Sequence, residues 1–179
     1  MPRWRLVEWA AACTDVAELL AAGQHQTLEF FVERLQEVSE PTVDYQELLY
    51  NASVLAHYAR VSTQSASDLT TPATLAEVFD HFVFDTSLRD DSAMMEAAGA
   101  QCLLLAGFFE DQLRRRHNIR WYAQLGVGFF SRAADLERSP HKVRVLAAIA
   151  SGFEPWRQRY ARLSRDLRER SFLLIRPPR

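Results

Sequence analysis

The chain has 179 residues, of which 48% are hydrophobic and 25% are charged, and its net charge is −2. This composition is that of a globular domain and excludes an intrinsically disordered chain. A chain of this length can bury a core without disulfides or metal, so we predict one domain over residues 1–170 and a tail over residues 171–179. Nothing in the sequence indicates export, so Cys13 and Cys102 are expected to be reduced and buried, in a cytoplasmic protein without a cofactor.

Helical periodicity runs through the chain, and no segment shows the alternation of a half-buried strand. We expect a first helix over about 3–22, ended by Gly23, because glycine suits the left-handed residue that follows many helices. A second helix is expected over about 27–38, with Thr27 as its N-cap and Pro41 after its end. The sequence therefore predicts two helices before Pro41.

The third helix, predicted over about 44–61, carries two apolar stripes. One stripe consists of Tyr45, Leu48, Ala52, Leu55 and Ala59, and the nearly opposite one of Tyr50, Val54, His57 and Val61. A surface helix needs only one such stripe. This helix is therefore predicted to be central in the domain, or to form a subunit interface that includes Tyr50, Val54 and Val61.

Four further helical segments follow a polar loop. An amphipathic helix begins near Thr74, a long apolar helix spans about 92–116, and a sixth helix contains residues 121–130. The last helical region is expected to break near 152–154, because Pro155 cannot lie unstrained inside a helix. The sequence thus predicts an all-α fold, a compact single-domain bundle of about seven helices.

The long apolar segment is predicted to be a buried helix and not a membrane span. Residues 93–109 are fewer than the roughly 20 residues that a span needs, and they include a glutamate. We therefore expect no membrane partner. Glycines on the fifth and sixth helices, Gly99, Gly107, Gly126 and Gly128, are expected to let neighbouring helices approach closely.

One candidate metal site lies on the fourth helix, where Glu77, His81 and Asp85 follow an i, i+4, i+8 spacing. Imidazole and carboxylate groups on one face suit a divalent metal. The chain lacks the Glu-x-x-His pairs of di-iron bundles, however, so solvent-facing ion pairs are the favoured interpretation. Ser53 and Cys102 qualify as nucleophiles by residue type alone, and no catalytic residue is predicted.

Charge is distributed unevenly along the chain. Residues 1–113 contain 5 arginines and 18 acidic residues, a net charge of −13, whereas residues 114–179 contain 16 basic and 5 acidic residues, a net charge of +11. All the basic residues except Lys142 are arginines, which a GC-rich genome also favours. Guanidinium groups suit phosphate binding. The candidate nucleic-acid contacts are Arg114, Arg115, Arg116, Arg162 and Arg165.

A competing explanation is that the basic part pairs with the acidic part, within one chain or between subunits. We favour it because the domain as a whole is not basic. The sequence accordingly predicts a non-enzymatic helical protein that binds another protein or forms a homo-oligomer, most simply a two-fold dimer. The alternatives are nucleic-acid binding through the arginine-rich end and, third, a metal-dependent or heme-oxygenase-like helical-bundle enzyme.

Overall fold

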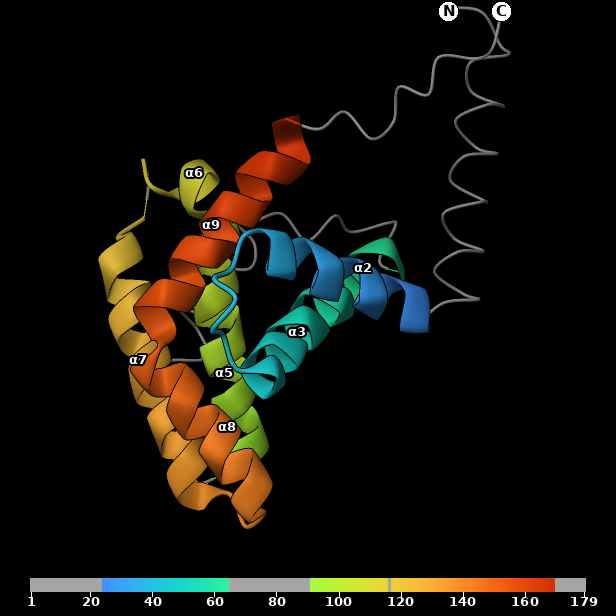
Figure 1. The fold of residues 1–179 in the computed structure, drawn as a ribbon. Helices are drawn as coiled ribbons and strands as arrows, with labels where there is room; N and C mark the ends of the chain where they lie inside the picture. Colours follow the sequence, from blue (N-terminus) through green and yellow to red (C-terminus); the bar gives the residue numbers. More distant parts are fainter. Residues whose placement is uncertain (1–23, 65–90, 116, 170–179) are drawn as a thin grey trace, which may run out of the picture.

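A computed structural model describes residues 24–64, 91–115 and 117–169 of the chain (Figure 1). These residues form seven α-helices and one π-helical turn, with no strand among them, which confirms the predicted all-α bundle. The elements are α2 (Gln24–Glu37), α3 (Tyr45–Gln64), α5 (Ser92–Leu103), the π-helical turn η2 (Leu104–Phe108), α6 (Glu110–Leu113), α7 (Ile119–Leu136), α8 (Pro140–Ser151) and α9 (Phe153–Glu169). The helices predicted over 3–22 and from Thr74 lie outside the described residues.

Short polar side chains cap three of the helices. Asp44 accepts hydrogen bonds from the backbone at the start of α3, Asp91 does so for α5 and Asn118 for α7. Such a side chain satisfies backbone N–H groups that have no partner within the helix. The predicted N-cap Thr27 is wrong, because α2 is already helical at Gln24.

The long apolar helix passes through the middle of the core, and η2 interrupts it. The backbone N–H of Phe109 donates to the Leu104 carbonyl at 2.9 Å, a hydrogen bond five residues back along the chain. Every side chain from Leu103 to Ala106 is buried, and Phe109 and Leu113 are buried beyond them. The prediction of one continuous helix over 92–116 is therefore wrong in this detail, although its central position is confirmed.

Three glycines set the closest contacts between helices. A Cβ atom at Gly99 would lie 2.9 Å from the Phe130 ring, and one at Gly126 would lie 2.4 Å from the Phe153 ring. At Gly107 it would lie 2.7 Å from the Cβ of Tyr160, so η2 packs directly against α9. Gly128 was expected to do the same, but no atom lies within 4 Å of its added Cβ, and that prediction is wrong.

The last two helices supply much of the core. α8 ends at Ser151 and α9 begins at Phe153, so the break falls where Pro155 predicts it. One apolar stripe runs along both helices and is buried; its members are Val145, Leu146, Ile149, Phe153, Trp156, Tyr160, Leu163 and the half-buried Leu167. None of the described helices combines the length and apolarity that crossing a membrane requires.

Candidate interaction surface

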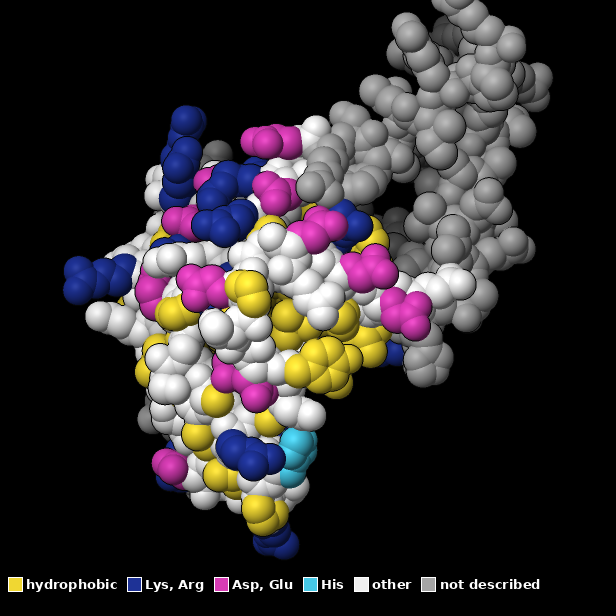
Figure 2. All heavy atoms as spheres, viewed as in Figure 1, with side chains coloured by type: hydrophobic (Ala, Val, Ile, Leu, Met, Phe, Trp, Pro, Cys, Tyr) yellow, Lys and Arg dark blue, Asp and Glu magenta, His cyan; other side chains and the backbone are white. Residues whose placement is uncertain are grey.

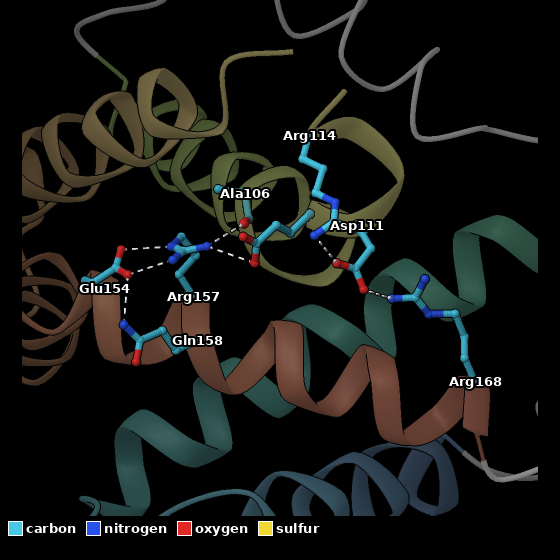
Figure 3. Close-up of polar contacts among 8 residues, drawn as sticks. Ala106, Asp111, Arg114, Glu154, Arg157, Gln158 and Arg168 are labelled. Atoms are coloured by element: carbon cyan, nitrogen blue, oxygen red, sulfur yellow. Dashed lines mark hydrogen bonds and ion pairs between the residues drawn. The ribbon is translucent and has the colours of Figure 1, made fainter. Parts of the chain in front are cut away.

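The most connected arginine, Arg157, lies on α9 facing η2 and α6 (Figure 3). Its guanidinium group contacts Glu110 at 3.0 Å and Glu154 at 2.7 Å, and it donates to the Ala106 carbonyl at 3.3 Å. Its side chain is only 17% exposed. The hydrogen bonds from Arg157 and Gln158 hold the pKa of the Glu154 carboxyl below its usual value. Arg157 therefore joins α9 to the π-helical turn and is not available to a phosphate.

Two more cations of the basic part reach acidic residues of the first part. Arg168 contacts Asp111 at 2.8 Å, and Lys142 contacts Glu96 at 2.7 Å. Arg114 lies 3.7 Å from Asp111 on the same helical turn. Together with Arg157, these contacts show that the basic and acidic parts pair within one chain at several points.

Lys142 also contacts Glu137, which connects α7 to α8. The carboxylate accepts from the backbone N–H groups of Arg138 at 2.7 Å and Ser139 at 3.1 Å, and Lys142 lies 3.2 Å away. These interactions, with the backbone hydrogen bonds first, lower the pKa of Glu137 to about 2. The contact with Glu96 raises the pKa of Lys142. This arrangement fixes the α7–α8 turn.

Three further candidate arginines, Arg115, Arg162 and Arg165, are exposed. Arg162 donates to the backbone carbonyl of Val38 at 3.4 Å. Arg115 and Arg165 have no side-chain partner among the described residues, and Arg116 lies outside them. Arg115, Arg162 and Arg165 therefore retain charge that a partner can use.

The aromatic residues of α9 are not available for stacking on nucleic-acid bases. Trp156 and Tyr160 are fully buried. The Trp156 indole donates to the Glu47 carboxylate at 2.8 Å, and the Tyr160 hydroxyl donates to the Asn51 carbonyl at 2.9 Å. Burial raises the pKa of Tyr160 well above its usual value. Both side chains fix α9 against α3, so they serve the fold.

The predicted interface residues of α3 differ in their surroundings. Tyr50 is half-buried, with its ring against Phe130 at a centroid distance of 6.1 Å, and Val54 also packs against the core of the same chain. Burial raises the pKa of Tyr50, and the negative charge of Glu96 raises it further. Val61 is 40% exposed. The second stripe of α3 is thus covered by its own chain over Tyr50 and Val54 and is exposed at Val61.

No described residues assemble a catalytic or metal centre. No group of three histidine, cysteine, aspartate or glutamate side chains in the described ranges is placed to hold a metal ion, and Glu77, His81 and Asp85 lie outside those ranges. Burial raises the pKa of Cys102, so its thiol stays protonated at neutral pH. The exposed Ser53 hydroxyl donates to the Tyr50 carbonyl.

His57 belongs to the second predicted stripe of α3, but its side chain is not part of the core. Its side chain is exposed, and its ring nitrogen lies 3.1 Å from the guanidinium of Arg60. Ser53 and Val61, four residues before and after it on α3, are exposed as well. His57 is therefore a surface residue.

An apolar surface with an acidic edge lies where α2 packs against α3. Tyr45 is 57% exposed, the largest value among the large hydrophobic residues of the described chain, and it lies between two hollows. The first hollow, of about 300 Å³, is lined by Leu28, Glu29, Val32, Glu33, Tyr45 and Leu49. The second, of about 370 Å³, is lined by Gln36, Ser39, Glu40, Pro41, Val43, Tyr45 and Leu48. We call this area the Tyr45 surface.

Sequence reasoning placed Tyr45 on a buried stripe and missed this surface. Leu48, Ala52 and Leu55 of that stripe are buried, but Tyr45, on the first turn of α3, is exposed. Its position immediately after the capping residue Asp44 was the available signal, because the first turn of a helix often extends past the core. Comparison with protein-family models, characterised proteins and solved structures finds no match to this chain.

Proposed function

We propose that this protein acts by associating with itself, and that the Tyr45 surface is the contact. The observation that carries the proposal is an exposed aromatic ring set between two hollows that are partly apolar. Tyrosine is enriched at the centres of protein interfaces, because it buries a large apolar area and still offers a hydroxyl to a partner. Tyr50 and Val54 pack inside the chain, and Val61 lies on nearly the opposite side of α3 from Tyr45, so the proposed contact does not include these three residues.

The arrangement of the arginines supports protein binding over nucleic-acid binding. Arg157, Arg168 and Lys142 are engaged by carboxylates of the same chain, and Trp156 and Tyr160 are buried. These ion pairs lower the charge that the basic part leaves for a ligand. Binding to a phosphate backbone is favoured by many closely spaced free cations. Among the described residues, these intramolecular ion pairs reduce that number.

Sedimentation velocity at micromolar concentrations tests the proposal. The wild-type protein is expected to sediment with twice the chain mass of 20.5 kDa. Tyr45→Ser should shift it toward the monomer, because the substitution removes the aromatic ring from the centre of the contact. Val127→Ser is the matched control, since Val127 is 40% exposed but lies on α7. A folded wild-type protein that stays monomeric at high concentration would contradict self-association.

A further inference from the structure

We propose that the association is two-fold and that the acidic face of α2 in one copy meets the arginine face of α9 in the other copy, twice. This inference rests on the proposed function and names the orientation of its contact. The acidic face consists of Glu29 and Glu33, and the arginine face consists of Arg162 and Arg165.

The acidic face borders the Tyr45 surface. Glu29 and Glu33 are four residues apart on α2, both are exposed, and both line the first hollow beside Leu28 and Val32. Neither carboxylate has a hydrogen-bond or ion-pair partner among the described residues. Like charges one turn apart repel each other and slightly destabilise a helix. An unpaired acidic row beside an apolar hollow gains most from a cationic partner.

The arginine face supplies cations of matching spacing. Arg162 and Arg165 are three residues apart on α9, which places them on one side of the helix, and both are exposed. Unlike Arg157, they face no carboxylate of their own chain within ion-pair distance in the described structure. Their guanidinium groups can each bind a carboxylate through two parallel hydrogen bonds.

The two faces are neighbours on one side of the molecule. The Arg162 guanidinium reaches the carbonyl of Val38, and the next two residues, Ser39 and Glu40, line the second hollow. Figure 2 shows acidic side chains along α2, an exposed apolar area beside them, and a group of basic side chains over the upper part of the bundle on the same face. A two-fold axis that runs between the two faces places each acidic face on the arginine face of the other copy.

In this dimer the apolar contacts and the charged contacts contribute to different properties, affinity and orientation. An exposed ion pair contributes little to stability, typically about 0–1 kcal/mol. The affinity must therefore come mainly from Tyr45 and the hollows, while the charges select the orientation and exclude others. Charge reversal consequently tests the orientation without removing the apolar contact.

The experiment uses two complementary double variants of the full chain. The first carries Glu29→Arg and Glu33→Arg, and the second carries Arg162→Glu and Arg165→Glu. In either homodimer like charges then face each other in both halves, and we expect the dimer dissociation constant to rise at least about tenfold. An equimolar mixture of the two is expected to recover wild-type affinity, because every facing pair is again of opposite sign. The variant with all four changes should recover it alone.

Control and contrary outcomes separate this inference from the proposed function. Asp135→Arg with Arg138→Glu reverses exposed charges near the α7–α8 turn and should leave dissociation unchanged. A wild-type dimer that the reversals do not weaken would overturn the inference and leave self-association standing. Reversals that weaken the dimer without rescue in the mixture would overturn the two-fold pairing. Circular dichroism of each variant establishes that the helical fold is retained.

Discussion

Two glycines on one helix, Gly126 and Gly128, should respond in opposite ways to the same substitution. Alanine is favoured over glycine in a helix interior by about 0.8–1 kcal/mol, because glycine loses more backbone freedom on folding. The Cβ added at Gly128 meets open space, so Gly128→Ala should stabilise the protein by about that amount. The two positions share α7 and differ in what lies around them.

At Gly126 the added methyl group has no room. It would lie 2.4 Å from the Phe153 ring and 2.9 Å from the Cβ of Cys102, and both residues are buried. The Phe153 ring is enclosed by the core and cannot swing aside, and the Cys102 Cβ is fixed by its backbone. Overpacking of this kind costs about 1–3 kcal/mol. With no room for the methyl group we expect the upper end of that range, about 3 kcal/mol. Subtracting the gain in helix propensity of about 1 kcal/mol leaves a net loss of about 2 kcal/mol in the free energy of unfolding.

Urea denaturation followed by circular dichroism measures both free energies of unfolding. In thermal melts, Gly128→Ala should raise the Tm by about 2–4 °C and Gly126→Ala should lower it by about 4–8 °C. Phe153→Leu removes the ring atoms nearest to the new methyl group, so in a double-mutant cycle it should offset part of the Gly126→Ala loss. Equal stabilisation by the two alanines would refute the close approach of α7 to α9 at Gly126.

Three further outcomes are expected. Trp156→Phe removes the hydrogen bond to Glu47 and should lower the free energy of unfolding by about 1.5–3 kcal/mol in urea denaturation, the usual range for a bond to a charged group. The folded-state pKa of Glu137 is lowered to about 2 from 4.5. Its stabilising contribution is therefore complete above pH 4.5 and is lost as the pH falls toward 2, so Glu137→Gln should flatten the acid-induced loss of stability over that interval. In fluorescence anisotropy at about 0.15 M salt, the dissociation constant for duplex DNA should be weaker than micromolar. Micromolar binding that weakens steeply with salt, and that is lost on Arg115→Glu and Arg165→Glu, would favour the nucleic-acid alternative.

Local sequence signals were sufficient for most helix positions. Pro155 acts on its immediate neighbours, so the helix break beside it can be read without the fold. The caps Asp44 and Asn118 were not predicted, and the predicted cap Thr27 lies inside α2. The stripe through Leu146 and Trp156 is buried as its spacing predicts. The π-helical turn η2 was not predicted, because a single hydrogen bond to the carbonyl five residues earlier does not change the spacing of apolar residues in the sequence.

The candidate site depended on tertiary positions that spacing does not contain. Arg157 and Arg165 lie on the same helix and look alike in sequence, yet one is joined to Glu110 and the other is exposed without a partner in the described structure. Gly126 and Gly128 differ in the same way. Which member of such a pair meets a neighbour is decided by how the helices cross, and one sequence alone does not fix that crossing.

The π-helical turn has a consequence for the angular phase of the chain beyond it. An α-helix advances about 100° per residue, so one extra residue in a turn rotates everything that follows by that angle relative to an uninterrupted helix. In the observed phase Phe109 and Leu113 point into the core while Glu110 and Asp111 reach Arg157 and Arg168. An uninterrupted helix would turn both sets away together, exposing the two apolar side chains and separating the acids from the arginines of α9. The length of one turn thus decides which cations of α9 remain free for a second molecule.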